Sequence, residues 1–347
     1  MYFNSFRLSP PEISYSGWRV PERVEVADDA NAVVFCRAVA WLEAVQKANF
    51  TEFPNSMLNA LTVDVEDYFH VAAFARQIDP ASWDRFPLRV EHNTQRLLDL
   101  FAERGVRATF FVLGWVAERC PNLVRAIADQ GHEVACHGYS HQLVYGQTPA
   151  VFREETVRAK ACLEDQAQRP VLGYRAASYS ITKRSLWALD ILAELGFAYD
   201  SSIFPVHHDR YGIPDSPRWP YRLNVPNGGS LIEFPPSTLG VGGHRLPVAG
   251  GGYFRIYPYS LTRFALSRIN RAEKRPFIFY LHPWEIDPEQ PRVRAGWLST
   301  FRHYTNLNRC EERLGRLLRD FRFAPVRDAL EGLAVPAISA ATAFVAA

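Results

Sequence analysis

Apolar runs of a few residues alternate with helical stretches along the middle of the chain, and several of these helical stretches end at a glycine. A glycine at that position can adopt the left-handed conformation that ends a helix. Strands that alternate with helices of this length favour right-handed parallel crossovers, and therefore an α/β fold. The pattern predicts strands at 58–65, 108–113, 132–136, 171–176, 197–200 and 277–281, and helices near 90–104, 121–130, 149–165, 183–195, 260–272 and 310–321.

Three segments depart from this alternation. Residues 1–56 form an N-terminal extension that we hypothesise to be dispensable, because Met57, one of only two methionines, comes directly before the first strand. Residues 201–257 are rich in proline, glycine and aromatic residues, which predicts an irregular segment that walls a site. We expect the main domain to cover 57–290, and residues 291–347 to be a C-terminal extension that packs on it and ends in a flexible tail.

Length, charge and cysteine usage narrow the class of protein. The 347 residues, 48% of them hydrophobic, can bury one large core. The net charge of +2 comes without a basic run, which favours neither a nucleic acid nor an anionic membrane as a partner. The five cysteines are scattered and favour a reducing compartment. With no signal peptide and no apolar run of roughly 20 residues, we expect a cytoplasmic protein without a membrane span.

Chemically useful side chains stand where several predicted strands end. The carboxyl ends of parallel strands meet on one face of the sheet, where ligands bind. We therefore predict that these side chains form one site. They are Asp64, Glu66 and Asp67 after the first strand, His137 and His141 after the third, Arg175 in the fourth, Asp200 in the fifth and His282 after the last.

The spacing of two histidines predicts a metal site. His137 and His141 stand four residues apart, so one helical turn would place both imidazoles on the same side. Two imidazoles and a carboxylate make a zinc site that leaves positions open for water and substrate. The acidic residues Asp64, Glu66 and Asp67 would repel one another unless a cation lay between them. The structural alternatives are that the two histidines lie in a polar loop and that the acidic residues cap a helix.

Other residues at the strand ends suggest acid–base chemistry. Asp64 ends an apolar run and is expected to be partly buried, as suits a general base. Arg175 could hold Asp64 through a charge-assisted fork. His282 ends the most apolar strand, where it could protonate a leaving amine, and Asp200 could orient its imidazole. The structural alternatives are that Arg175 is a surface arginine and that His282 is a histidine of the core.

Taken together, these motifs resemble those of the NodB-homology polysaccharide deacetylases, carbohydrate esterase family four, over roughly residues 58–284. The resemblance implies an irregular seven-stranded β/α barrel with a C-terminal extension, and removal of N-acetyl groups from N-acetylhexosamine units of a polysaccharide. Two motifs also resemble the branch encoded with exosortase-linked exopolysaccharide clusters, which implies a role in exopolysaccharide biosynthesis. The motifs are Thr62–Asp67, His137–His141, Arg175, Asp200 and Leu281–Pro283, and those of the branch are Asp64–His70 and Leu281–Glu285.

The resemblance also implies residue roles and a cofactor. The cofactor would be Zn²⁺ or another divalent transition metal. The third metal ligand is either Glu66 or Asp67, because the family's second acid is displaced here, and Asp67 is slightly preferred. The remaining roles are Asp64 as the base, Arg175 as its tether, His282 as the general acid, Asp200 as its partner, and His137 and His141 as metal ligands.

Departures from the family pattern affect the substrate-binding residues. The arginine motif continues without the usual proline, so the backbone N–H of Ser178 is expected to be the oxyanion donor. The usual tryptophan is missing after the aspartate motif, so Trp219 or Trp284 would wall the acetyl pocket. Tyr139 and Tyr179 are the other predicted substrate-binding residues.

Other functions remain open. An open groove lined by aromatic residues would favour a polymer as substrate, and a closed pocket would favour a small amide. The alternatives are a peptidoglycan deacetylase, a C–N hydrolase acting on a small amide, and an inactive glycan-binding module.

Overall fold

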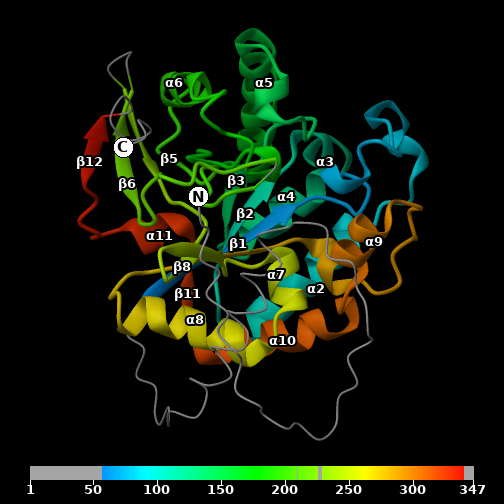
Figure 1. Ribbon diagram of the computed structural model, residues 1–347. Helices are drawn as coiled ribbons and strands as arrows, with labels where there is room; N and C mark the ends of the chain where they lie inside the picture. The colour runs from blue at the N-terminus through cyan, green and yellow to red at the C-terminus, as the bar shows by residue number, and fades with distance from the viewer. Residues whose placement is uncertain (1–56, 209, 226–228, 340–347) are drawn as a thin grey trace, which may run out of the picture. The chain divides into compact units, whose positions relative to one another are not determined.

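The structure is a computed structural model, and it describes residues 57–208, 210–225 and 229–339 (Figure 1). The predicted N-terminal extension and the end of the predicted flexible tail lie outside the described residues. Among those residues, no helix combines the length and the apolar character needed to cross a bilayer.

Seven parallel strands in a row form the centre of the fold. They run in the order β10-β1-β2-β3-β4-β5-β7, and β1 is buried along nearly its whole length, as expected for a strand covered on both faces. The strands are β1 (Leu58–Val65), β2 (Thr109–Val112), β3 (Glu133–Cys136), β4 (Gly173–Tyr174), β5 (Tyr199–Asp200), β7 (Ser230–Glu233) and β10 (Ile278–Leu281).

The row closes irregularly between its two ends. No ladder joins β7 to β10 in the described part of the chain, and residues 235–250 span the gap instead. The backbone N–H of Ile278 donates to Ser237 Oγ (2.9 Å), and that of Tyr280 donates to the carbonyl oxygen of Ala249 (2.7 Å). Gly250 adopts φ +131°, and a Cβ there would lie 1.9 Å from the carbonyl oxygen of Tyr280. The α/β fold expected from the sequence, an irregular β/α barrel, is confirmed.

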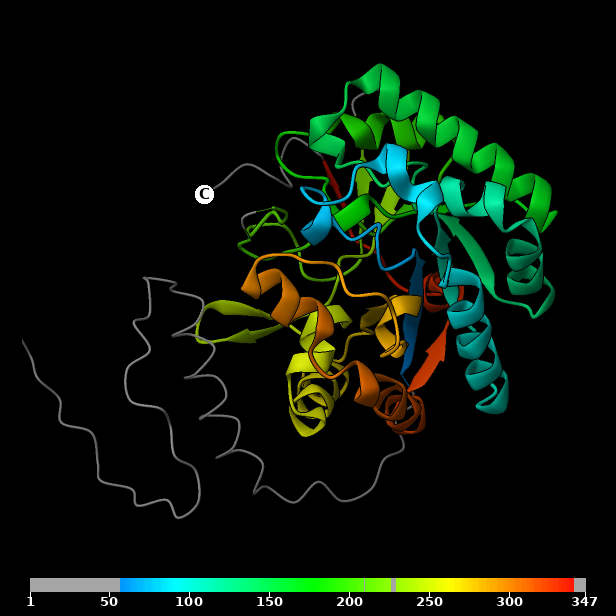
Figure 2. The ribbon, with the colours of Figure 1, turned by 90° about the vertical axis from the view of Figure 1, so that its right-hand side faces the viewer.

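Helices surround the strands (Figures 1 and 2). In α2, for example, Val90, Leu97, Leu98 and Phe101 are buried at helical spacing and form one apolar face. The helices are α2 (Val90–Glu103), α3 (Gly114–Arg119), α4 (Pro121–Asp129), α5 (Pro149–Ala167), α6 (Trp187–Glu194), α7 (Gly251–Ile256), α8 (Tyr259–Arg271), α9 (Trp297–Tyr304), α10 (Leu307–Asp320) and α11 (Val326–Leu330).

The later part of the chain has more regular structure than the sequence predicted. The segment 201–257 contains β7, α7, the strand β6 (Tyr221–Asn224) antiparallel to β7, and the hairpin β8 (Thr238–Val241) and β9 (His244–Pro247). Further on, β11 (Arg322–Ala324) pairs with the start of β1, and β12 (Ala337–Ser339) pairs with β6. Residues beyond 291 therefore add strands to the sheet.

Candidate active site

Three predicted metal ligands meet at the carboxyl ends of β1 and β3. Glu66, His137 and His141 each offer one ligand atom, and these three atoms lie within 4.8 Å of one another. Glu66 Oε2 is 2.7 Å from His141 Nε2, yet the two groups are not aligned as a hydrogen bond. A buried carboxylate oxygen without a donor, facing two imidazoles, is a donor set that fits a divalent transition metal.

The environment of His137 also suits a metal ligand. Its Nδ1 is 2.8 Å from the carbonyl oxygen of Arg175, so this nitrogen donates its hydrogen there and leaves Nε2 free. Burial lowers the pKa of His137 to about 4, so the ring is neutral, as a ligand must be. Burial would raise the pKa of Glu66, but His141 and His282 lower it well below its usual range.

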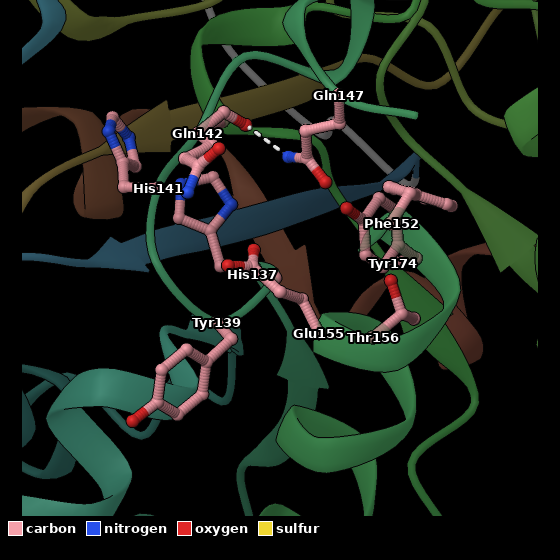
Figure 3. Close-up of a pocket in the computed structure, with 11 residues that line it drawn as sticks. His137, Tyr139, His141, Gln142, Gln147, Phe152, Glu155, Thr156 and Tyr174 are labelled. Atoms are coloured by element: carbon pink, nitrogen blue, oxygen red, sulfur yellow. Dashed lines mark hydrogen bonds between the residues drawn. The ribbon is translucent and has the colours of Figure 1, made fainter. Parts of the chain in front are cut away.

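The two histidines converge through a loop and not through a helical turn, which corrects the sequence-based expectation. Gly138 and His141 both have positive φ angles (75° and 52°), and the ring centroids of His137 and His141 are 5.4 Å apart. Figure 3 shows the hollow that this loop borders. Gln147 Nε2 donates to the carbonyl oxygen of Gln142 (3.0 Å), which ties down the end of the loop.

Asp67 lies elsewhere, although it was the preferred third ligand. Its Oδ2 accepts hydrogen bonds from the backbone N–H groups of Arg89 (2.6 Å) and Val90 (2.8 Å) at the start of α2, and its Oδ1 accepts one from Tyr68 (2.9 Å). Both oxygens are thus occupied by backbone donors, as at a helix cap. Burial raises the pKa of Asp67 to about 6 despite these donors. The structure places Glu66, and not Asp67, beside the histidines.

Asp64 and Arg175 form a buried ion pair. Arg175 Nη1 donates to Asp64 Oδ1 (2.7 Å) and to Thr62 Oγ1 (2.8 Å), and Nη2 donates to Ser201 Oγ (3.0 Å). The guanidinium also lies over the ring of Phe111, 4.2 Å from its centroid. Arg175 is therefore not a surface arginine. One oxygen of Asp64 is fixed by this contact, and the other lies 3.9 Å from His282 Nε2.

His282 is held by Glu285 and not by Asp200, which corrects a second expectation. His282 Nδ1 is 2.7 Å from Glu285 Oε1, and its Nε2 is 3.4 Å from Glu66 Oε1. Burial would lower the pKa of His282, but the carboxylates of Glu66 and Glu285 raise it to about 9. The 3-10 helix η5 (Pro283–Ile286) begins directly after His282 and returns Glu285 to its side.

Asp200 instead belongs to a buried carboxyl pair. Its Oδ1 accepts from Ser202 Oγ (2.5 Å), and it lies opposite Glu233 in the pairing of β5 with β7. Both side chains are fully buried, and burial raises the pKa of Asp200 to about 6 and that of Glu233 well above its usual range. The two carboxyl groups are therefore expected to share a proton.

The predicted substrate-binding residues divide into two groups. Ser178 follows Arg175 closely and has φ 50° within the 3-10 helix η4 (Ala177–Tyr179), and Trp284 stacks on His282 with ring centroids 5.1 Å apart. The Tyr139 hydroxyl donates to Glu118, and Figure 3 shows its ring directed away from the histidines.

The two remaining aromatic residues of that set, Tyr179 and Trp219, have different neighbours. The Tyr179 ring is buried beside the site: its centroid is 5.6 Å from the guanidinium carbon of Arg175 and 5.1 Å from the ring centroid of Tyr280. The Trp219 ring lies under the guanidinium of Arg218, which pairs with Glu273 of the α8–β10 connection. The predicted aromatic wall is thus only partly assembled.

Two residues of the site were missed by the sequence analysis. Glu285 lies within the Leu281–Glu285 motif, so its position next to His282 was a usable signal. Arg255, whose Nε donates to Glu285 Oε2 (2.6 Å), lies in a segment expected to be irregular, and no motif marks it.

Comparison with known proteins gives the family. Residues 81–199 match the family model described as polysaccharide deacetylase, and residues 201–331 match a domain of unknown function, DUF3473. The chain therefore contains a polysaccharide deacetylase domain of the NodB-homology family, as its motifs predicted. The exosortase-associated branch stays a prediction.

Individual relatives agree with this family. A peptidoglycan-N-acetylglucosamine deacetylase of Bacillus cereus is 36% identical over 70 residues, 20% of this chain and 26% of the relative. A chitooligosaccharide deacetylase of Rhizobium leguminosarum bv. trifolii is 33% identical over 117 residues, 33% of this chain and 50% of the relative. The chain thus spans half or less of the length of these relatives.

A solved structure supports the fold. A protein of Mycobacterium smegmatis, provisionally named a polysaccharide deacetylase, superposes with a TM-score of 0.53 at 23% identity over 82% of this chain and 93% of that chain.

Proposed function

We propose that this protein is a metal-dependent hydrolase that removes N-acetyl groups from N-acetylhexosamine units of a polysaccharide. The observation that carries the proposal is the cluster of Glu66, His137 and His141, with Asp64 and His282 beside it. This arrangement combines a metal site of open coordination with a base and an acid.

Glu66 Oε2, His137 Nε2 and a ring nitrogen of His141 would hold the metal. When bound, a Zn²⁺ or similar ion supplies Lewis acidity that polarises the acetyl carbonyl and acidifies water. The buried, donor-free oxygen of Glu66 and the fixed tautomer of His137 are the features of the chain that fit such an ion.

The protein residues would move the protons. Asp64 accepts the proton of the attacking water on Oδ2, because Arg175 already occupies Oδ1. The water oxygen bonds to the carbonyl carbon, and a backbone N–H at Ser178 would donate to the developing oxyanion. As the C–N bond breaks, its electron pair takes the proton on His282 Nε2, which gives acetate and a free amine.

The class of substrate rests on the relatives. The names of the matched relatives specify peptidoglycan N-acetylglucosamine and chitooligosaccharides, both of which contain N-acetylated sugars. A role in exopolysaccharide biosynthesis rests on the resemblance of the motifs, and peptidoglycan is the second candidate substrate. An inactive glycan-binding module is disfavoured because the base, the acid and the possible ligands are all present.

Acetate release from an N-acetylglucosamine oligomer tests the proposal. Metal-stripped protein should be inactive and regain activity with Zn²⁺, whereas His137→Ala should stay inactive. His244→Ala, which alters an exposed histidine in β9, is the matched control and should behave like wild type. Tight stoichiometric zinc binding without any acetate release would refute deacetylation of this substrate and favour another amide or a binding role.

A further inference from the structure

One carboxylate holds both the backbone and the side chain of His282. Glu285 Oε1 accepts from the backbone N–H of His282 (3.1 Å) and lies 2.7 Å from His282 Nδ1. Glu285 is fully buried. The turn η5 therefore places the carboxylate so that it fixes the orientation and the tautomer of the imidazole, and directs Nε2 towards the cluster.

A buried arginine keeps this carboxylate in place. Arg255 Nε donates to Glu285 Oε2 (2.6 Å), while its Nη atoms donate to the carbonyl oxygens of Arg302 (2.9 Å), His303 (2.8 Å) and Thr305 (2.8 Å). Burial would raise the pKa of Glu285, but the Arg255 guanidinium and the hydrogen bond with His282 lower it. Glu285 is consequently ionised, and α9 fixes the arginine that keeps it so.

Aromatic stacking holds the face of the same imidazole. Trp284 lies over His282 with an interplanar angle of 19°, and His303 lies over Trp284 with ring centroids 4.2 Å apart and an angle of 16°. His303 comes from α9, and its Nε2 is 2.6 Å from Gln290 Oε1. The three stacked rings restrict rotation of His282 out of its plane.

Every residue of this support belongs to the segment 201–331, which matches a domain of unknown function, and none to the matched deacetylase segment 81–199. We infer that Glu285 is the positioning residue of His282, and that this segment serves the reaction by orienting the general acid through Glu285, Arg255 and α9. The inference rests on the proposed function. In the acid step, the proton leaves Nε2 for the amine nitrogen, and the neutral ring that remains keeps its Nδ1–H on Glu285.

Two substrates with different leaving groups separate positioning from structure. Breaking the amide of an N-acetylglucosamine oligomer needs a proton on the leaving amine, whereas an activated aryl acetate expels a phenolate without one. Glu285→Gln should lower kcat for the amide about 100-fold, the lower end of the contribution of a general acid. Its ratio of ester to amide turnover should rise by about the same factor. His137→Ala should instead lose both activities together.

Matched variants control for folding. Glu289→Gln removes an exposed carboxylate just beyond the same turn and should leave both rates unchanged. Glu285→Asp keeps the charge against Arg255, and its shorter side chain withdraws from His282. It should therefore fold even if Glu285→Gln does not, and raise the ester-to-amide ratio about 10-fold. Metal content and the melting temperature are measured for each variant.

The outcomes are distinct. A higher ester-to-amide ratio in the Glu285 variants with metal retained supports the inference. Equal loss of both activities, or no loss of either, in a wild-type background that releases acetate would overturn it and leave the proposed function standing. Wild-type protein that releases no acetate from the oligomer would overturn the proposed function, and the positioning role with it.

Discussion

Two neighbouring acids, Glu66 and Asp67, allow a sharp test of which carboxylate belongs to the metal site. Glu66→Gln and Asp67→Asn each exchange one oxygen for nitrogen at a buried position, so volume is conserved and only the charge and acceptor capacity change. Glu66 faces His137 and His141, whereas Asp67 faces backbone N–H groups. The two variants should therefore fail in different ways.

The expected magnitudes follow from these contacts. Loss of a directly binding carboxylate should weaken metal binding at least as much as the loss of an outer-shell partner, which costs up to about 100-fold, or about 2.7 kcal/mol. Asp67→Asn can keep two backbone donors on its remaining oxygen but leaves the N–H of Tyr68 facing an amide group. A buried donor left without an acceptor costs about 1–3 kcal/mol of folding stability.

Competition with a chelator measures the zinc dissociation constant of each variant, and urea unfolding of the metal-free proteins measures the stability. Glu66→Gln should show the weaker metal binding, with little change in the metal-free unfolding midpoint. Asp67→Asn should show the lower midpoint with zinc affinity within about threefold of wild type. The opposite pattern, zinc binding lost in Asp67→Asn and kept in Glu66→Gln, would refute the assignment.

Three further predictions concern the tether of the base, the buried carboxyl pair and the closure of the barrel. Arg175→Lys keeps the charge but loses the guanidinium that bonds Asp64, Thr62 and Ser201 at once, so kcat for acetate release should fall about 100-fold with the metal content unchanged. Burial raises the folded-state pKa of Glu233 well above its usual range and that of Asp200 to about 6, so the folded state binds protons more tightly than the unfolded one. The contribution of this pair to stability should therefore fall as the pH rises from about 4 through 6 and beyond, and Glu233→Gln should raise the melting temperature relative to wild type more at pH 8 than at pH 5. Gly250→Ala would push a Cβ to 1.9 Å from a β10 carbonyl oxygen and should cost about 2–4 kcal/mol in urea unfolding, whereas Gly296→Ala, with nothing within 4 Å, should change little.

Strands within continuous apolar runs were predictable from the sequence, and the half-buried strands of the later chain were not. The range 58–65 predicted for the first strand agrees with β1, because both faces are covered and the apolar run is continuous. β7 alternates buried positions with exposed or half-buried ones over only four residues, and β11 has three residues. A half-buried strand of three or four residues has too few positions to show a periodicity, and its pairing is decided by contacts far away in the sequence.

The candidate site was likewise predictable only in part. Convergence of Asp64, His137 and Arg175 followed from the rule that parallel strands end on one face, and the structure brings these residues together. The choice between Glu66 and Asp67 did not follow, because it depends on how the chain turns after β1. That turn directs one acid at the histidines and the other at the first N–H groups of α2, and the composition of the motif is the same either way.

Asp200 and Glu285 show why a sequence alone does not assign the partner of an acid–base histidine. Both are buried carboxyl groups, but Asp200 has another carboxyl group for a neighbour, and Glu285 has a guanidinium. A buried pair of carboxyl groups retains a proton, so Asp200 is a poor counter-charge for a protonated imidazole. Arg255 keeps Glu285 ionised, so Glu285 can stabilise His282 in its charged form and hold its orientation. What distinguishes the two acids is therefore an arginine 30 residues before Glu285, which only the fold brings to it.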